Sequence, residues 1–234
     1  MAPRPRWYPV TLDLDGRPCL VVGGGPVAAR KAAGLAACGA AVTMVAPAFG
    51  GEAEALARPP GPGADSVPGT VTLARRPYEA GEAARYRLVV TATGRDEVDG
   101  PVAADADRAG VWVNSADDVE HCTFILPSVH RDGPVSVAVS TGGASPALAS
   151  WLRRRVATAL GPDLGTLATL LEEARSRVRA GGRSTESVDW RAVLDGPLPA
   201  LVREGRIEEA RARLAEATDG AGAGAPPAGP GAPS

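Results

Sequence analysis

A run of three glycines between two hydrophobic segments is the feature of this sequence that most limits its fold. An apolar run at residues 17–22 (RPCLVV) leads into Gly23–Gly25, and small residues with helical periodicity follow from Pro26. This order predicts a strand, a tight turn and a helix. Gly39 ends the helical pattern, and the apolar residues 40–47 predict a second buried strand, which completes a β-α-β unit.

The glycine turn matches the G-x-G-x-x-G/A pattern of dinucleotide-binding proteins, with Ala28 in the last position. Gly23 permits the tight turn out of the strand, and Gly25 lets the backbone approach a pyrophosphate. The first turn of the following helix offers unpaired N–H groups and a partial positive charge to the phosphates. The alternative is a glycine turn that serves only helix packing. The pattern assigns cofactor binding to Gly23, Gly24, Gly25, Pro26 and Val27.

The end of the second predicted strand lacks the acidic residue that usually binds the ribose 2′-hydroxyl of NAD. Residues 45–48 (VAPA) stand there, Glu52 is the nearest acid, and no arginine stands there for the 2′-phosphate of NADP. We expect backbone contacts from Pro47 and Ala48 to the ribose, and NAD is favoured over NADP. Further cofactor contacts are predicted at later strand ends, from Thr91, Ala92, Thr93 and Asn114.

Strands and helices alternate through the first half of the chain. A Pro/Gly-rich loop at residues 58–69 is followed by alternating elements. The sequence predicts strands at 70–76, 87–93 and 111–116, a short helix at 79–86 and a helix at 96–110. Such alternation indicates an α/β fold with a parallel sheet covered on both faces. Right-handed crossovers make a Rossmann-like, doubly wound sheet the expected arrangement.

The pattern changes near residue 119. Two strand-like runs at 123–128 and 134–141 flank a turn at VHRDG. Ser145 followed by proline marks the start of a helix, with serine as its N-cap. Helices are expected at residues 145–160 and 163–182, with shorter helical segments to about residue 217.

This pattern divides the chain into four parts. The tail is rich in glycine, alanine and proline and has no means of burying a core, so it is expected to be disordered. The expected parts are a NAD-binding Rossmann domain at 1–118, a small β-rich region at 119–147, a helical domain at 148–217 and the disordered tail at 218–234.

Composition excludes several classes of function. The net charge is −2 and the sequence pI is about 5.8, so a broad basic surface for nucleic acid is not expected. The N-terminal residues lack the apolar run of a signal peptide, and no apolar stretch reaches the roughly 18–20 residues of a membrane span. We expect a cytoplasmic protein without a nucleic-acid or membrane partner. Cys19, Cys38 and Cys122 form no C-x-x-C pair, which argues against disulfides and a structural zinc site.

Six segments occur in one order along residues 7–180 and resemble a known family. They are CLVVGGGPVAARKA, VTMVAP, VVTATG, VNSADD, FILPS and VAVSTGGASPALA. The chain resembles precorrin-2 dehydrogenase, the oxidase and chelatase portion of siroheme synthase. The resemblance implies NAD-dependent oxidation of precorrin-2 to sirohydrochlorin in siroheme biosynthesis. In bifunctional members it also implies ferrous-iron insertion into sirohydrochlorin.

The same resemblance implies how the chain is assembled. Residues 119–147 are expected to be a dimerisation region, which joins two copies into an intertwined homodimer. No methyltransferase domain is appended to this sequence, so it resembles the stand-alone form of the family.

The resemblance assigns the catalytic role to Asp117, the last residue of an N-x-x-D motif that begins at Asn114. A carboxylate just past the end of a strand can act as a general base toward a macrocycle proton, and it can also take pyrrole N–H protons as iron enters. Asp118 is adjacent, and a shift of one position in the alignment would exchange the two. Val119 stands where the family often has proline. The alternative for Asp117 is a solvated loop acid or a helix N-cap.

Precorrin-2 is a polycarboxylate, so cationic groups are expected around it. Lys31 lies in the first predicted helix and matches the family pattern V-A-x-R-K, and Arg131 lies in the predicted hairpin. The motif S-T-G-G begins at Ser140, and some bacterial relatives carry a phosphorylatable serine at the position of Thr141. The predicted substrate-binding residues are Lys31, Arg131, Thr141 and Gly142.

His121 and Cys122 invite a metal-ligand interpretation, but the chain has two histidines and no further cysteine nearby, so no metal site is predicted. Cys122 is expected to be a small buried hydrophobe. Two other hypotheses stay open. The first is a non-catalytic, dinucleotide-sensing regulatory module, which explains the glycine turn but neither Asp117 nor residues 140–146. The second is a dehydrogenase without chelatase activity, which explains Asp117 and residues 140–146 as well.

Overall fold

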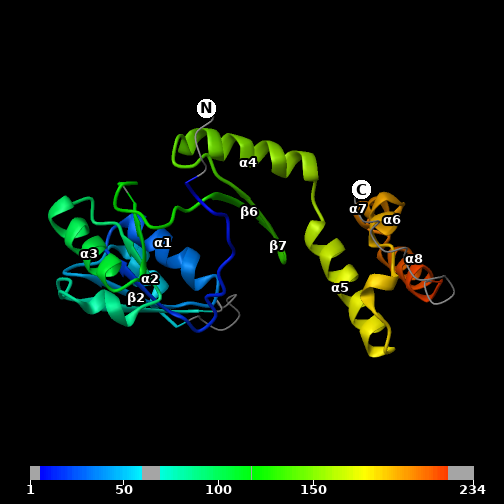
Figure 1. The fold of residues 1–234 in the computed structure, drawn as a ribbon, viewed down its shortest axis with the longest axis horizontal. Helices are drawn as coiled ribbons and strands as arrows, with labels where there is room; N and C mark the ends of the chain where they lie inside the picture. Colours follow the sequence, from blue (N-terminus) through cyan, green and yellow to red (C-terminus); the bar gives the residue numbers. More distant parts are fainter. Residues whose placement is uncertain (1–5, 60–68, 117, 221–234) are drawn as a thin grey trace, which may run out of the picture. The chain divides into compact units, whose positions relative to one another are not determined.

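The computed structural model describes residues 6–59, 69–116 and 118–220, which form two units (Figure 1). The first unit comprises the described residues up to Leu126 together with Gly142–Ala144. The second comprises Pro127–Thr141 and the described residues from Ser145 onward. Most of the predicted loop at 58–69 and of the predicted tail at 218–234 lies outside the described residues. The predicted domain boundaries stay predictions.

A five-stranded parallel sheet forms the centre of the first unit. Its strands are β1 (Pro18–Val22), β2 (Ala41–Ala46), β3 (Thr70–Arg75), β4 (Leu88–Thr91) and β5 (Trp112–Ser115), in the order β3-β2-β1-β4-β5. Every neighbouring pair is parallel, so the carboxyl ends of all five strands lie at one edge of the sheet. The strand order reverses between β1 and β4. The predicted doubly wound sheet is confirmed.

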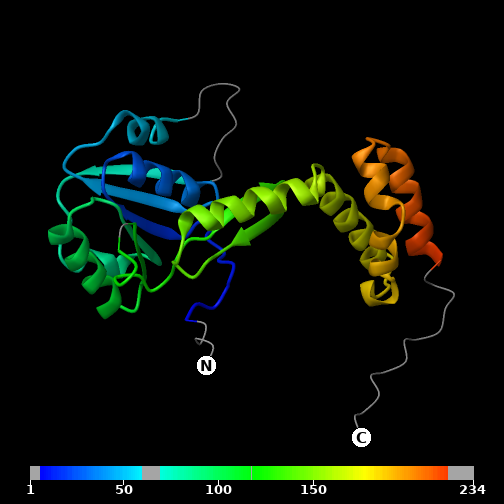
Figure 2. The ribbon, with the colours of Figure 1, turned by 90° about the horizontal axis from the view of Figure 1, so that it is seen from above.

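Helices α1 (Pro26–Ala36) and α3 (Asp96–Arg108) cover the two faces of this sheet (Figure 2). Alternate residues of β1 point to opposite faces: Cys19 and Val21 pack in the cluster with α1, whereas Leu20 and Val22 pack in the cluster with α3. A parallel sheet buried on both faces explains why its strands read as continuous apolar runs. Two short helices, α2 (Gly51–Leu56) and η1 (Glu82–Arg85), complete the unit.

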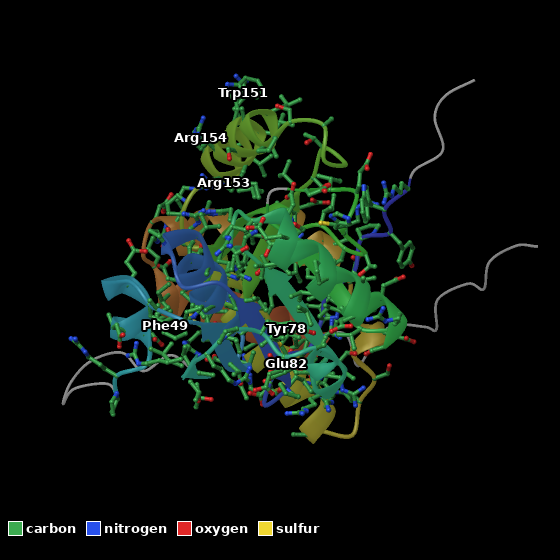
Figure 3. The ribbon with its side chains drawn as sticks, turned by 90° about the vertical axis from the view of Figure 1, so that its left-hand side faces the viewer. Phe49, Tyr78, Glu82, Trp151, Arg153 and Arg154 are labelled. Atoms are coloured by element: carbon green, nitrogen blue, oxygen red, sulfur yellow. The ribbon has the colours of Figure 1, made fainter. Side chains whose placement is uncertain are left out.

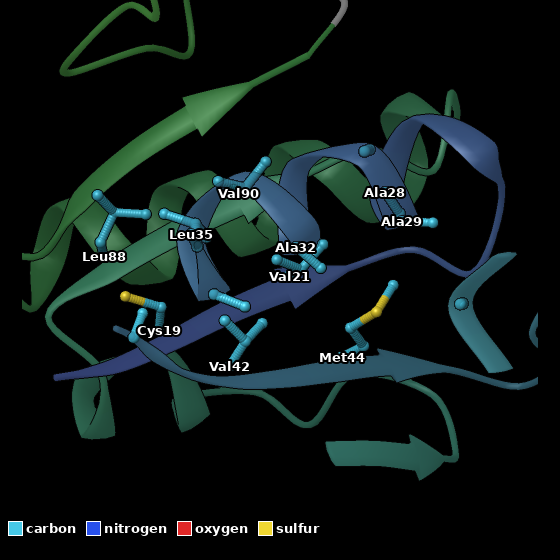
Figure 4. Close-up of a cluster of buried hydrophobic side chains, with 14 residues drawn as sticks. Cys19, Val21, Ala28, Ala29, Ala32, Leu35, Val42, Met44, Leu88 and Val90 are labelled. Atoms are coloured by element: carbon cyan, nitrogen blue, oxygen red, sulfur yellow. The ribbon is translucent and has the colours of Figure 1, made fainter. Parts of the chain in front are cut away.

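Small side chains bring α1 close to the sheet. Ala28, Ala29 and Ala32 are buried in the same cluster as Val21 and Met44 of the strands (Figure 4). Because each alanine projects only a methyl group, the helix backbone can approach the strands closely. This packing places the first turn of α1 directly at the end of β1.

A β-hairpin opens the second unit, and its first strand differs from the prediction. Strand β6 (Ser128–Asp132) pairs antiparallel with β7 (Val135–Val139), so the predicted strand at 123–128 is wrong. Thr123 is instead held beside β5 of the first unit, where its N–H donates to the Val113 carbonyl and its hydroxyl accepts from the Val113 N–H. The N–H groups of Thr123 and Phe124, which a hairpin strand would need for its own pairing, both donate to the Val113 carbonyl.

Helices form the rest of the second unit. Ser145 caps α4 as predicted, because its hydroxyl accepts the Leu148 N–H at 3.1 Å. The elements are α4 (Pro146–Leu160), α5 (Leu164–Ala180), η2 (Thr185–Ser187), α6 (Trp190–Asp195), α7 (Leu198–Arg203) and α8 (Ile207–Gly220). Helix α8 continues past the predicted end at residue 217, and the Thr218 hydroxyl donates to the Leu214 carbonyl. No helix in the described ranges is both long and apolar enough to cross a membrane.

A buried carboxylate anchors the loop between β3 and η1. Glu82 is 1% exposed, and the Arg76 guanidinium donates to both of its oxygens at 3.0 and 2.7 Å (Figure 3). Burial alone would raise the pKa of Glu82, but the bonds from Arg76 and from the Glu79 N–H outweigh it and lower that pKa. The loop is therefore held by an ion pair that stays charged at neutral pH.

A second carboxylate ties the same loop to α3. Asp105 accepts hydrogen bonds from the Gly81 N–H at 2.6 Å and from the Tyr78 hydroxyl at 2.9 Å, and these bonds lower its pKa. Burial, together with the bond to Asp105, raises the pKa of Tyr78 to about 12. The two carboxylates fix the course of the chain between β3 and β4.

We expect Glu82→Gln to lower the free energy of unfolding by about 1–3 kcal/mol, because the half-buried Arg76 loses its counter-charge. Urea unfolding measures the change. The deficit should shrink as the pH falls through the lowered pKa of Glu82, where the wild-type carboxylate is itself protonated. Glu79→Gln is the control, because Glu79 is 62% exposed and 3.6 Å from Arg76. Equal destabilisation by both variants would contradict the role of the Arg76–Glu82 ion pair in holding the loop.

Candidate functional site

The glycine turn lies at the end of β1, where the strand order reverses. The Gly23 N–H donates to the Val45 carbonyl of β2, and the Ala92 N–H donates to the Val22 carbonyl, each at 2.9 Å. The turn is thus bonded to the neighbouring strands on both sides. In open α/β sheets, ligands bind outside the carboxyl ends of the strands at this position.

Two of the three glycines are required by close backbone contacts. Gly23 has φ of +140°, and a Cβ atom there would lie 2.5 Å from the Ala92 carbonyl oxygen. A Cβ atom on Gly24 would lie 2.0 Å from the Ala48 carbonyl oxygen, and the Gly50 N–H donates to the Gly24 carbonyl at 2.9 Å. The sequence predicted the role of Gly23, whereas the constraint on Gly24 comes from the loop after β2.

Gly25 is different, because its surroundings are open. Its φ of −85° suits any residue, and among the described residues no heavy atom lies within 4 Å of where its Cβ atom would be. Gly25 is the N-cap of α1, no side chain of the described residues caps this helix end, and its first turn contains no acidic residue. The first N–H groups of α1 are therefore uncapped, and such a helix end is a common binding position for a phosphate group. Pro26 stands at the start of α1, as predicted.

The other predicted cofactor residues lie at the same edge of the sheet. Pro47 and Ala48 follow β2 and are exposed. Thr91 is fully buried at the end of β4, and its hydroxyl makes no hydrogen bond within the described part of the chain. The Oδ1 atom of Asn114 in β5 is likewise buried without a partner among those residues. Such atoms at a sheet edge fit contacts to a bound ligand.

Thr93 has a local structural partner. Its hydroxyl donates to Asp99 Oδ1 at 2.9 Å, and its N–H donates to Asp99 Oδ2 at 3.3 Å. Burial raises the pKa of Asp99, and these hydrogen bonds oppose that shift. The carboxylate thus shapes the turn between β4 and α3, which carries Ala92 and Thr93.

Cys122 organises the segment that follows β5. Its sulfur accepts from the Ser115 N–H at 3.2 Å and from Asn114 Nδ2 at 3.5 Å, and it donates to the Asp118 carbonyl at 3.2 Å. Asn114 Nδ2 also donates to the Phe124 carbonyl at 3.1 Å. The thiol is buried, as expected, but the sequence did not predict that it would hold both ends of this segment together.

Asp117 lies outside the described residues, whereas its neighbour Asp118 is described and has two partners in the following turn. Asp118 Oδ1 accepts the Glu120 N–H at 2.7 Å, and Asp118 Oδ2 lies 2.9 Å from His121 Nδ1. Both oxygens of Asp118 are therefore engaged in the turn. Within the described ranges, no group of three His, Cys, Asp or Glu side chains is placed to hold a metal ion.

Parts of the predicted substrate site come together in the first unit. The charge of Lys31 on α1 acts on the Cys122 thiol and opposes the rise in its pKa that burial causes. Trp7 Nε1 donates to the Gly142 carbonyl at 3.2 Å, and a Cβ atom on Gly143 would lie 3.5 Å from Val119 Cγ1. Gly143 of the S-T-G-G motif thus lies beside the segment after β5.

Thr141 and Arg131 belong to the second unit. The Thr141 hydroxyl donates to the Ser145 carbonyl and accepts the Ser145 N–H, both at 3.1 Å, so it shapes the turn before α4. Arg131 lies on β6 and is exposed. The four predicted substrate residues are divided between the two units.

A parallel sheet with an open glycine turn at its reversal point defines the first unit as a dinucleotide-binding domain of the Rossmann type. The chain belongs to the family described as putative NAD(P)-binding, whose model matches residues 10–128. A second model, described as sirohaem biosynthesis protein central, matches residues 132–159. The family assignment supports the predicted NAD cofactor.

Curated relatives extend this similarity beyond the first unit. The chain is 39% identical to the siroheme synthase of Methylococcus capsulatus over 217 residues and 36% identical to that of Nitrosococcus oceani over 217 residues. Each match covers 92% of this chain and 44% of the relative, so the chain spans less than half the length of these relatives. The resemblance to siroheme synthase is confirmed.

A solved structure shares the fold. The structure named "SirC, precorrin-2 dehydrogenase" superposes with a TM-score of 0.69 at 24% identity. The match covers 91% of this chain and 100% of that chain. It confirms the predicted fold, with the Rossmann-like sheet followed by a hairpin and helices.

We expect Gly25→Ala to abolish dinucleotide binding and leave the fold intact, because its methyl group would enter only the open space before α1. Thermal unfolding with and without NAD measures both effects, since a ligand that binds the native state raises its stability. Gly24→Ala is the matched variant and should lower the melting temperature without ligand, because it clashes with the Ala48 carbonyl. Normal NAD stabilisation of Gly25→Ala would contradict this site.

The three thiols are expected to differ in reactivity. Cys38 is exposed, whereas Cys19 and Cys122 are buried. Burial raises the pKa of Cys19 to about 11 and also raises that of Cys122, so few thiolates form there at pH 8. Iodoacetamide should modify one thiol in the folded protein and three in urea, as counted by mass spectrometry. In Cys38→Ser the folded protein should stay unmodified, and rapid labelling of Cys122 would contradict the described packing.

Proposed function

We propose that this chain oxidises precorrin-2 to sirohydrochlorin, with NAD as the hydride acceptor. One observation carries the proposal: the open start of α1, the segment after β5 and Gly142–Gly143 all belong to one unit with a dinucleotide-binding fold. The names of the siroheme synthase relatives and of the precorrin-2 dehydrogenase structure support the substrate.

The reaction removes a hydride and a proton from the macrocycle. NAD, when bound, supplies the hydride acceptor, so the protein must orient the two molecules and take up the proton. The glycine turn and the first N–H groups of α1 would hold the pyrophosphate, and Pro47 and Ala48 would contact the ribose. Thr91, Ala92, Thr93 and Asn114 would line the space beyond, toward β5.

Asp117 is proposed as the general base. In the sequence it comes two residues after Ser115, the last residue of β5, and ligands of such sheets bind beyond the carboxyl ends of the strands. The engagement of both Asp118 oxygens, by the Glu120 N–H and by His121, supports Asp117 over its neighbour as the group available for proton transfer. Cys122 and Asn114 would act as positioning residues, because their bonds shape the segment that carries Asp117.

Cationic and small residues are proposed to bind the substrate carboxylates. Lys31 contributes a positive charge beside the segment after β5, and Gly142 borders the same segment through its neighbour Gly143. Arg131 and Thr141, which belong to the second unit, stay predictions of the sequence as substrate-binding residues. Ferrous-iron insertion and a homodimer stay predictions of the family resemblance, and a cytoplasmic location stays a prediction of the composition.

The proposed activity is tested by mixing the purified chain with precorrin-2 and NAD and following the absorbance of sirohydrochlorin. NAD-dependent product formation is the expected result. If NAD binds and no product forms, the proposed activity is wrong, and a dinucleotide-sensing role becomes the better interpretation.

Asp117→Asn should lower turnover by about 10²–10⁴-fold, because the general base is lost, and should leave the NAD dissociation constant within about twofold. Initial rates and an NAD titration measure the two quantities. Asp118→Asn is the control and should retain turnover within about tenfold, because its carboxylate is tied to the turn. A larger loss of turnover in Asp118→Asn than in Asp117→Asn would show that Asp118, and not Asp117, is the general base.

A further inference from the structure

We propose that the Arg75–Glu54 ion pair sets the preference of this chain between NAD and NADP. The two residues stand at the end of the sheet where adenosine is expected, and neither was a candidate in the sequence. The inference deepens the proposed function, and it rests on that function only for the binding of a dinucleotide.

Strand pairing places Arg75 of β3 beside the last residue of β2. Arg75 is the last residue of β3 and stands in register with Ala46, the last residue of β2. The strands are parallel and neighbouring strands lie about 4.8 Å apart, so the two ends share one edge of the sheet. Residues 45–48 contain no arginine that could bind the 2′-phosphate of NADP. Arg75 supplies one from the neighbouring strand.

The loop after β2 connects this position to the glycine turn. From Ala46 the chain passes over Gly24, where the Ala48 carbonyl would meet a Cβ atom at 2.0 Å and the Gly50 N–H donates to the Gly24 carbonyl. Phe49 lies in the same loop, partly buried against the core. A dinucleotide with its pyrophosphate at the start of α1 extends its adenosine across this loop toward β2 and β3.

Arg75 is held by two partners. Its Nη2 atom lies 2.5 Å from Glu54 Oε1 of α2, and its guanidinium carbon lies 5.5 Å from the centroid of the Phe49 ring. The side chains of Arg75 and Glu54 are 54% and 33% exposed, so both remain accessible from solvent. The pair thus presents one positive and one negative group at the adenosine end of the site.

This arrangement favours a ribose hydroxyl over a ribose phosphate. A 2′-hydroxyl can donate to the Glu54 carboxylate, in the role that an acidic residue at the end of the second strand usually has. A 2′-phosphate carries about two negative charges and would attract Arg75, but Glu54 neutralises that cation and repels the phosphate. Glu52 adds a further negative charge in the first turn of α2.

A purely structural role makes a different prediction. If the pair only ties α2 to β3, removing Glu54 lowers stability slightly and changes binding of both dinucleotides by the same factor. If the pair sets cofactor preference, the ratio of the two dissociation constants changes. That ratio is therefore the decisive measurement.

The experiment titrates NAD and NADP separately into the full chain and follows binding by calorimetry. In Glu54→Gln the affinity for NADP relative to NAD should rise about fivefold to tenfold, because Arg75 loses its neutralising partner. In Arg75→Gln the relative affinity for NADP should fall, and the double variant should lose the gain of Glu54→Gln. The gain should also shrink at high salt, because the groups are exposed.

Glu216→Gln is the matched control. Glu216 pairs with Arg213 at 3.0 Å on α8 of the second unit and is also exposed, so its removal should leave the ratio unchanged. Glu54→Asp provides a second variant that keeps the charge and should retain the preference for NAD if Glu54→Gln does not fold. A ratio within twofold of wild type in folded Glu54→Gln would overturn the inference.

The outcomes separate this inference from the proposed reaction. If NAD binds, no sirohydrochlorin forms and the ratio shifts as expected, the reaction is wrong and the role of the ion pair stands. If sirohydrochlorin forms and the ratio does not shift, the reaction stands and the role of the ion pair is wrong. A wild-type chain that binds NADP more tightly than NAD would also overturn the inference.

Discussion

The close approach of three backbone segments at the end of β1 is the contact on which the rest of the site depends. The carbonyls of Ala92 and Ala48 come so near Gly23 and Gly24 that neither position has room for a side chain. This packing holds the turns after β2 and β4 against the start of α1, and the buried alanines of α1 keep the helix at that depth. Gly25 is left as the open position of the turn, because a Cβ atom there would have no heavy atom of the described residues within 4 Å.

Buried polar groups then determine how the surrounding loops run. Glu82 and Asp105 fix the chain between β3 and β4, Asp99 shapes the turn that carries Thr93, and Cys122 closes the segment after β5. Each of these side chains is buried and belongs to a helix or loop outside the strands of the sheet. Hydrogen bonds with fixed geometry hold these side chains in place, because a buried polar atom without a partner is costly.

Much of the fold could be predicted because strong local signals agreed with one another. The glycine turn, the continuous apolar runs of a sheet buried on both faces, and Ser145 with Pro146 at the start of α4 each have a local physical cause. The first hairpin strand could not be predicted, because residues 123–128 have a strand-like composition, whereas Thr123 is bonded to Val113 through its N–H and its hydroxyl. That competition depends on β5, an earlier element of the sequence, and not on residues 123–128 themselves.

The sequence by itself determined the β-α-β unit, the family resemblance and the position of the dinucleotide turn, because these follow from short-range periodicity and from residues within one motif. Only the tertiary structure decided which groups meet around that turn. Strand register brought Arg75 to the end of β2, a neighbouring loop made Gly24 obligatory, and the thiol of Cys122 joined the two ends of the segment after β5. Such contacts join residues from different elements, and their distances are set by packing and register.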